Sequence, residues 1–296
     1  MEPPRSFAVE GGERLRVGMP LAVLAAVEHL VRKKYEEERA AWARESAENR
    51  RLRMGCGGPE QPQEFFRARF PFFEVLLDPP RERPVRADAP TAQTLGCSWS
   101  WRAGDEAPEV QQELLRKLQR PPMDTDDVHY LWIRNLGLYI PREGKNRVDF
   151  FREHGVEMIP AFVTPCTYPA PERFGVYEMG LGEQRQIWIV LDGNFAQPAP
   201  VCFGEIEALW QAYGVAPSRR WPELASAELP SAALVVAAFA AAGRPWVCFD
   251  ELLEADAREA AVDPARGHGG ARWVWFAALC ALVAALMVLL TQVVAR

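Results

Sequence analysis

The residues best suited to chemistry stand together in a short glycine turn, Gly144-Lys145-Asn146-Arg147. The apolar spacing that follows predicts a helix closing at Gly155. A helix that begins at a glycine leaves backbone N–H groups free, and basic side chains beside them favour an anion. Phosphate is the natural ligand for such a corner. The sequence therefore predicts that Gly144, Lys145, Asn146 and Arg147 bind a phosphate group.

Catalysis at this turn would also need a base or a metal-holding carboxylate. Glu143 lies immediately before the turn and is the candidate catalytic group, although its position also suits a solvated loop acid. The acids between residues 124 and 127 read first as a solvated acidic turn. No Ser-His-Asp order, HExxH, Walker A or GxGxxG pattern occurs. We therefore expect ligand binding without appreciable turnover.

The elements expected around the turn follow from apolar spacing and from turn residues. We expect a helix at 108–119, two short strands at 129–135 and 137–141, and a strand at 156–163. A long helix after Pro20 either packs on the main domain or forms a partner-binding arm. Other expected elements are a buried strand at 70–78, a hairpin of 172–179 with 185–193, helices at 203–214, 230–242 and 250–260, and a strand at 246–249.

This order of elements resembles the ParB/sulfiredoxin-like superfamily over residues 70–165. In that family a helix precedes a short hairpin, a GxxR turn starts the next helix, and a strand containing Ile-Pro follows, which here is Ile159-Pro160. The proline- and arginine-rich segment 76–86 is similar to the box that opens the same domain. The resemblance implies a mixed α/β core and a nucleotide-phosphate pocket. In that pocket Gly144 permits close approach of the backbone, Arg147 pairs with phosphate oxygens, and Arg81 and Arg83 supply a second arm.

The turn departs from the family pattern in two ways. ParB proteins usually carry an acid at the second position of the turn, where this chain has Lys145, followed by Asn146. Sulfiredoxins need a cysteine inside the turn, and this turn has none, so sulfiredoxin activity is not expected. No helix-turn-helix stands out after the turn, and a net charge of −6 argues against nucleic acid as a partner.

Residues 273–294 form a stretch of twenty-two residues without a charge, bracketed by Arg272 and Arg296. At about 1.5 Å per residue a helix of this length spans roughly 33 Å, enough to cross a bilayer core. Trp273 and Trp275 suit the headgroup layer. The sequence therefore predicts a single-pass, tail-anchored membrane protein whose bulk faces the cytoplasm, with scattered, reduced cysteines.

The expected fold is α/β, with a mixed-sheet ParB-like core, a long N-terminal helix and one C-terminal transmembrane helix. The expected division is an amphipathic helical segment (1–58), the core (70–165), an α/β extension (166–262), a tether (263–271) and the anchor (272–296). The expected function is a membrane-anchored module that binds a nucleotide, with or without Mg²⁺, or another phosphate ligand. The alternatives are a nucleotide-hydrolysing or phosphotransfer enzyme using the GxxR turn, and a membrane-tethered adaptor with a vestigial pocket that recruits a protein partner through the N-terminal helix.

Overall fold

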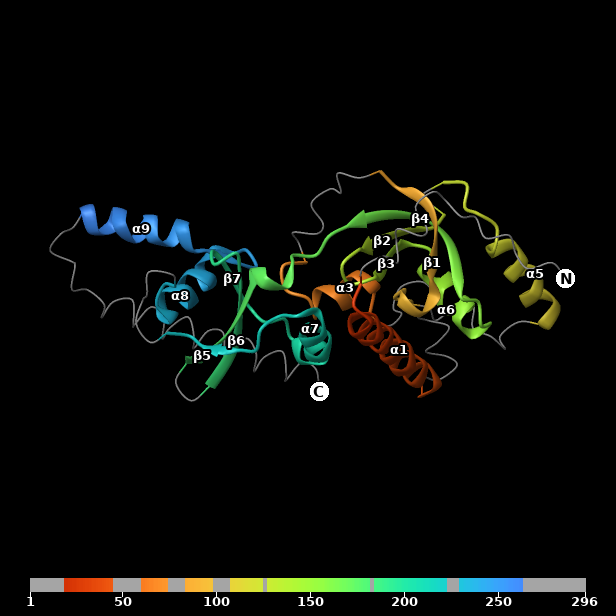
Figure 1. Cartoon of the computed structure of the whole chain (residues 1–296), viewed down its shortest axis with the longest axis horizontal. Coiled ribbons are helices and arrows are strands. Elements are labelled where there is room, and N and C mark those ends of the chain that lie inside the picture. Colours follow the sequence, from red (N-terminus) through yellow and green to blue (C-terminus); the bar gives the residue numbers. More distant parts are fainter. Residues whose placement is uncertain are drawn as a thin grey trace. The chain divides into compact units, whose positions relative to one another are not determined.

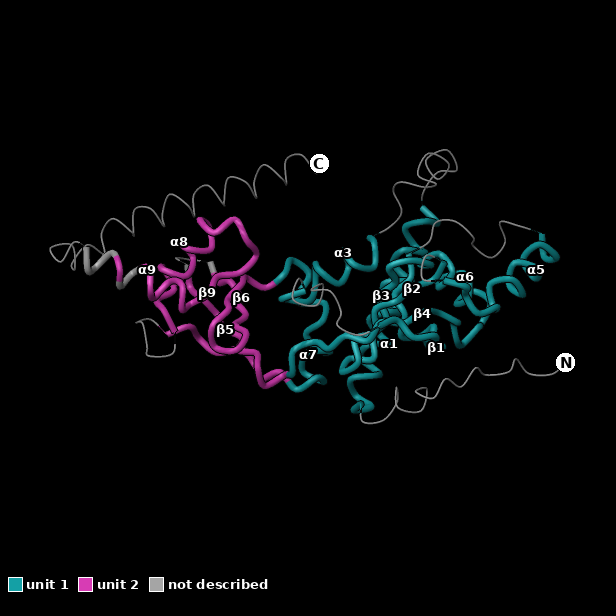
Figure 2. The backbone as a smooth tube through the Cα atoms, turned by 90° about the horizontal axis from the view of Figure 1, so that it is seen from above, with its two compact units in different colours: residues 1–170, 200–214 teal, residues 171–199, 215–296 magenta. Residues whose placement is uncertain are grey.

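The computed structural model describes residues 19–44, 60–73, 83–97, 107–124, 127–181, 184–222 and 229–262. They divide between two compact units (Figure 1, Figure 2). Unit 1 is drawn from residues 1–170 and 200–214, and unit 2 from residues 171–199 and 215–296. Each unit has a mixed sheet of its own. Helix α1 (Leu21–Arg44) belongs to unit 1, and the chain returns to unit 1 at 200–214.

Unit 1 is built on a four-stranded sheet in the order β1-β4-β2-β3. Strand β4 runs antiparallel to β1 and parallel to β2, and β2 and β3 form a hairpin. Gly137 closes the hairpin at φ 66°, a left-handed conformation that glycine adopts without steric cost. The expected hairpin and the expected strand after it are confirmed. The strands are β1 (Val85–Pro90), β2 (His129–Ile133), β3 (Leu138–Glu143) and β4 (Met158–Cys166).

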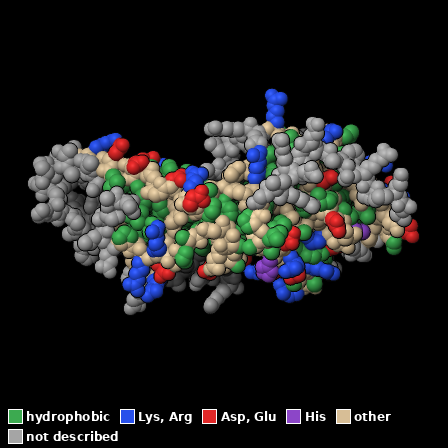
Figure 3. All heavy atoms as spheres, in the orientation of Figure 1, with side chains coloured by type: hydrophobic (Ala, Val, Ile, Leu, Met, Phe, Trp, Pro, Cys, Tyr) green, Lys and Arg blue, Asp and Glu red, His purple; other side chains and the backbone are tan. Residues whose placement is uncertain are grey.

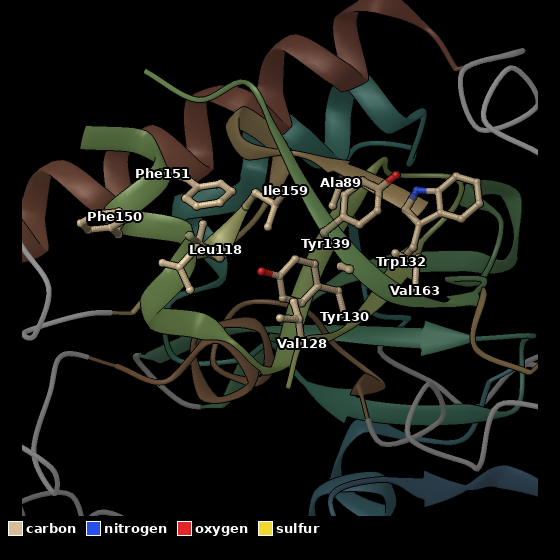
Figure 4. Close-up of a cluster of buried hydrophobic side chains, with 12 residues drawn as sticks. Ala89, Leu118, Val128, Tyr130, Trp132, Tyr139, Phe150, Phe151, Ile159 and Val163 are labelled. Carbon is tan, nitrogen blue, oxygen red and sulfur yellow. The ribbon is translucent and has the colours of Figure 1, made fainter. Parts of the chain in front are cut away.

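The helices of unit 1 pack apolar side chains onto this sheet. One buried cluster combines Tyr130 and Val163 of the sheet with Phe151 of α6 and Leu118 of α5 (Figure 4). The expected helices before and after the glycine turn are confirmed as α5 and α6, and the expected 203–214 helix as α7 with a preceding 3-10 turn. The helical segments are α1 (Leu21–Arg44), α3 (Pro62–Arg67), η1 (Thr91–Gln93), α5 (Pro108–Leu118), α6 (Lys145–Glu153), η3 (Phe203–Ile206) and α7 (Glu207–Tyr213).

Helix α1 is the expected long N-terminal helix, and it packs on unit 1. Its buried face includes Val27 and Val31, as the apolar spacing predicts. The same face also buries Lys34 and Glu38. These two side chains form an ion pair, and Lys34 Nζ donates a 2.7 Å hydrogen bond to the carbonyl of Gly96. Burial of these charges is possible because each has a partner.

The predicted strand at 70–78 is wrong over its first four residues. Residues 70–72 form a bend and a turn, with Phe72 at φ 57°, and Phe73 is helical. The aromatic rings are nevertheless buried: Phe70 stacks on Phe66 with ring centroids 3.9 Å apart, and Tyr168 meets both rings edge-on. The apolar run at 70–73 therefore indicates buried side chains and not an extended backbone. The remainder, 74–78, lies outside the described residues.

Strand β1 is not among the elements that the sequence predicts. The strand pairs antiparallel with β4 from Val85↔Val163 to Pro90↔Met158. It lies at the edge of the sheet, and only Ala89 along its length is fully buried. An edge strand of this kind needs little apolar patterning and tolerates proline at its end. The sequence therefore carried no strand signal at this position.

Unit 2 holds a five-stranded sheet in the order β8-β5-β6-β7-β9. The expected hairpin is confirmed as β5 and β6, and the expected alanine-rich helix, short strand and acidic helix as α8, β9 and α9. Trp188 of β6 packs edge-on against Phe239 of α8 within the core of this unit. The elements are η2 (Pro171–Arg173), β5 (Phe174–Leu181), β6 (Gln184–Leu191), β7 (Phe195–Pro198), β8 (Arg219–Arg220), α8 (Ala232–Ala242), β9 (Val247–Cys248) and α9 (Phe249–Val262).

The expected membrane anchor (272–296) is not among the residues that the structure describes. No helix within the described residues is long and apolar enough to cross a bilayer. The predicted tether (263–271) and anchor (272–296) both lie outside those residues. Among the described residues, Cys97, Cys166, Cys202 and Cys248 are not joined by disulfides.

Candidate functional site

The glycine turn joins the end of β3 to the start of α6, and Gly144 is the N-cap of that helix. Its backbone lies in the left-handed region at φ 80° and ψ 16°. A Cβ atom at this position would lie 3.0 Å from Cγ1 of Val128 and 3.4 Å from the carbonyl oxygen of Asp127. Conformation and space both select glycine, and in consequence no side chain caps the helix from this position.

The first turn of α6 carries two cations and no acid. Lys145 and Arg147 lie there, whereas acidic side chains are the ones that the positive end of a helix dipole favours. A cation at this end is disfavoured by about 0.3–1 kcal/mol. The N–H of Arg147 already bonds to the carbonyl of Gly144 at 3.1 Å. A bound anion would offset the cations and would cap the remaining N–H groups of the turn.

Arg147 points beneath the end of α5. Its Nη1 donates to the carbonyl oxygen of Leu118, the last residue of α5, over 3.4 Å. Burial lowers the pKa of the Arg147 guanidinium, while Tyr130 and the Asp127 carboxylate act in the opposite direction. The guanidinium is therefore half-buried, and within the described residues it donates one long hydrogen bond to a carbonyl.

Lys145 points in a different direction from Arg147, as expected for residues two apart on a helix. Its Nζ donates to Oε1 of Gln61, just before α3, over 2.5 Å. Asn146 between them is half-buried. The two cations thus flank the helix start from opposite sides, and each has a partner within unit 1.

The second arm expected from the family resemblance is not assembled by the described residues. Arg83 is exposed and precedes β1, while Gly144 follows β3. These strands are the two edges of the four-stranded sheet, so they are about 14 Å apart at the usual strand spacing. Arg81 lies outside the described residues.

Glu143, the candidate catalytic group, is exposed at the end of β3 and is paired in register with His129 of β2. The half-buried imidazole of His129 hydrogen-bonds through Nε2 to Oγ1 of Thr164 at 2.7 Å. Burial lowers the pKa of His129, the Arg142 charge lowers it further, and Glu143 raises it. Sequence reasoning missed His129 and Thr164, because only the strand pairing brings them together.

A row of residues paired in register crosses the sheet from Glu143 and His129 to Phe162 and Arg86. Phe162 of β4 pairs in register with both His129 and Arg86. The Arg86 guanidinium lies 5.3 Å from the centre of the Phe162 ring and donates to the carbonyl of Met123 at 3.4 Å. The row Arg86–Phe162–His129–Glu143 therefore mixes positive, aromatic and negative groups. On the face shown in Figure 3, basic and acidic side chains are likewise interspersed.

A buried polar cluster supports α6 from the side of α1. Asp149 of α6 pairs with Arg152 at 2.6 Å, and Arg152 donates to the carbonyls of Thr91 and Thr94 at 2.9 and 2.8 Å. Cys97 lies in the same region, and burial raises the pKa of its thiol to about 11. The thiol is therefore protonated at neutral pH and is a poor nucleophile.

Unit 2 has a cavity of its own, of about 560 Å³, lined in part by Tyr177, Asp192 and Asp250. Asp192 forms a bidentate ion pair with Arg173, with distances of 2.7 and 2.6 Å. Asp250 accepts from Asn194 Nδ2 at 2.7 Å. Asp192 also has φ 55°, so it serves the turn between β6 and β7, as its sequence Asp-Gly-Asn suggests.

Among the residues that the structure describes, no group of three or more His, Cys, Asp or Glu side chains is placed to hold a metal ion. Comparison of the chain with protein-family models, with curated proteins and with solved structures finds no match in any of the three.

Proposed function

We propose that this chain is a binding module for a phosphate-bearing ligand, with a nucleotide as the leading candidate, and that the start of α6 receives the phosphate. The observation that carries the proposal is a helix start with a glycine N-cap, two cations in its first turn and no acid. Such a helix start gains most from an anion, because the dipole, the free N–H groups and the side-chain charges all act in the same direction.

The same surroundings favour binding over catalysis. Glu143 is exposed, whereas a general base works best when its surroundings fix its position and tune its pKa. The Cys97 thiol is buried and protonated. A nucleotide would bring Mg²⁺ with it, and the carboxylates of Glu143 and Asp127 are oxygen ligands of the kind Mg²⁺ takes. The metal would supply positive charge to the phosphates.

Two further parts of the proposal rest on the sequence. The order of helix, hairpin, glycine turn, helix and strand supports a ParB/sulfiredoxin-like core for unit 1. The uncharged segment 273–294 supports a C-terminal anchor that would hold the module at a membrane, with the remainder on the cytoplasmic side.

A protein adaptor is the second candidate, and one observation favours it. Both cations of the turn already have partners within unit 1, since Lys145 bonds to Gln61 and Arg147 to the carbonyl of Leu118. If these contacts are the whole purpose of the two side chains, the turn is structural and the pocket vestigial. The chain would then act by presenting a surface to a partner protein.

Calorimetry and thermal unfolding of the purified full-length chain separate these candidates. We expect ATP, GTP, CTP or pyrophosphate, with and without Mg²⁺, to raise the unfolding temperature. A ligand at a hundred times its dissociation constant stabilises the folded state by about 2.7 kcal/mol. Arg147→Ala and Lys145→Ala should weaken this effect, and Arg120→Ala, at an exposed arginine just after α5, should not. Absence of binding by the wild-type chain, or equal binding by all three variants, would leave the adaptor.

A further inference from the structure

The hydroxyl group of Tyr130 is buried without a hydrogen-bond partner. Tyr130 has no exposed surface, and among the described residues nothing donates to or accepts from its hydroxyl oxygen. Buried polar groups are nearly always paired, and phenylalanine would fill the same space with no unpaired group. The hydroxyl therefore needs an explanation other than packing.

The position of this hydroxyl connects it to the glycine turn. In Figure 4 it lies on the side of the ring that faces Leu118. The carbonyl of Leu118 is the group that Arg147 reaches from the first turn of α6, over 3.4 Å. The Arg147 charge also acts on the Tyr130 hydroxyl, so the two groups lie near each other. A buried O–H donor and a half-buried guanidinium thus approach each other beneath the last turn of α5.

Helix α5 covers the Tyr130 hydroxyl and the Arg147 guanidinium, but few of its own side chains are buried. Leu118 is its only buried residue, Leu114 and Leu115 are half-buried, and much of the rest is exposed, including Val110. The carbonyl groups at a helix C-terminus carry partial negative charge. The Leu118 carbonyl is therefore a weak, internal substitute for an anion at the guanidinium of Arg147.

We propose that Tyr130 and Arg147 form the inner end of the phosphate site, and that a ligand oxygen takes the position that the Leu118 carbonyl holds in this structure. This inference rests on the proposed function. On binding, a non-bridging phosphate oxygen replaces the carbonyl and accepts hydrogen bonds from the Tyr130 hydroxyl and the Arg147 guanidinium. The last turn of α5 moves aside to admit it. The ligand class is a terminal phosphate or a diphosphate.

The first test is Tyr130→Phe, compared with Tyr139→Phe on the neighbouring strand of the same core. Without ligand, we expect Tyr130→Phe to unfold at the same temperature as the wild type or higher, because an unpaired hydroxyl is removed. Its affinity for pyrophosphate and for ATP should fall about tenfold or more, as expected for losing a hydrogen bond to a charged group. Tyr139→Phe should bind both ligands like the wild type. Titration with pyrophosphate and ATP separately distinguishes phosphate recognition from recognition of the whole nucleotide.

The second test concerns the last turn of α5 and the carboxylate of Asp127. Hydrogen exchange of the amides at 115–119 should become faster when pyrophosphate binds, because the last turn of α5 is displaced. In the absence of Mg²⁺, Asp127→Asn should bind pyrophosphate more tightly, since an exposed carboxylate that acts on Arg147 is neutralised.

The outcomes separate this inference from the proposed function. If the wild-type chain binds neither pyrophosphate nor ATP, both are overturned. If the wild type binds, Arg147→Ala does not, and Tyr130→Phe binds like the wild type, the phosphate site stands and the role of Tyr130 is overturned. Unchanged or slower exchange at 115–119 on binding would overturn the displacement of α5.

Discussion

Replacing Gly96 by alanine tests how the structure holds α6 in place. The backbone at Gly96 lies directly against the side chain of Asp149, so that a Cβ atom there would be 1.9 Å from its Oδ1. Non-bonded atoms do not approach this closely, and therefore the Asp149 carboxylate must move. Asp149 is almost fully buried and is paired with Arg152 at 2.6 Å.

The size of the effect follows from the ion pair that is displaced. Removing one partner of a buried ion pair costs about 3–5 kcal/mol, because the other charge is left uncompensated, and we expect a cost of this order when the Asp149 carboxylate is displaced from Arg152. A domain of ordinary stability has about 5–15 kcal/mol in total. At about 2–4 °C per kcal/mol for a chain of this size, Gly96→Ala should lower the unfolding temperature by roughly 6–20 °C. The carbonyl of Gly96 also accepts from Lys34, so the docking of α1 should weaken as well.

The assay is thermal or urea unfolding of the full-length chain, with Gly204→Ala as the matched control. Gly204 also belongs to unit 1, and a Cβ there would meet nothing within 4 Å. The control should change stability by less than about 1 kcal/mol. We also expect the two sites to be coupled: in an Asp149→Ala background the clash is gone, and Gly96→Ala should then cost little. An unfolding temperature for Gly96→Ala within about 2 °C of the wild type, or additive costs in the double variant, would show that close contact with Gly96 does not hold Asp149 in place.

Three further predictions concern other parts of the chain. Because the pKa of His129 is lowered in the folded state, the unfolded chain binds the proton more tightly. The contribution of His129 to stability is therefore complete above about pH 6.5 and is lost as the pH falls through the lower folded pKa. The difference in unfolding free energy between the wild type and His129→Gln should change in favour of the wild type from pH 5 to 7. A difference that stays constant over this range would contradict this prediction. Asp192→Asn should leave the free energy of unfolding nearly unchanged, because the ion pair with Arg173 is exposed and asparagine tolerates positive φ. Asp192→Ala should be more destabilising, and equal unfolding temperatures for the two variants would count against this prediction. Deleting residues 272–296 should release the chain into the soluble fraction, and persistence in carbonate-washed membranes would show a second anchor.

The elements of both units could largely be predicted because their apolar spacing is strong. The hairpin at Gly137 and the helix between Gly144 and Gly155 carry turn residues that fix the backbone locally. The edge strand β1 lacks such a signal, and its partner β4 is distant in sequence. The segment 70–73 shows the opposite failure, since aromatic packing buries it without any strand.

The candidate site could be predicted only in its local part. Gly144 and the two cations after it are adjacent in sequence, and their position at a helix start follows from the pattern. The direction of each side chain does not, because Gln61 and Leu118 come from other elements. Tyr130 and His129 read as ordinary strand residues, and only the packing of α5 and the pairing of β2 with β4 reveal their surroundings.

An anion bound at the first turn of α6 lies next to the backbone amide of Asn146, so this amide is a direct probe of binding. The chain has four asparagines, Asn49, Asn135, Asn146 and Asn194, so ¹⁵N-asparagine labelling of the full-length chain gives few backbone signals, with Asn146 assigned by its loss in Asn146→Gln. Titration with pyrophosphate should shift the Asn146 amide proton downfield in a saturable way, leave Asn135 and Asn194 nearly unmoved, and produce no such shift in Arg147→Ala. An Asn146 signal that stays in place up to millimolar pyrophosphate, or that moves equally in Arg147→Ala, would contradict the account.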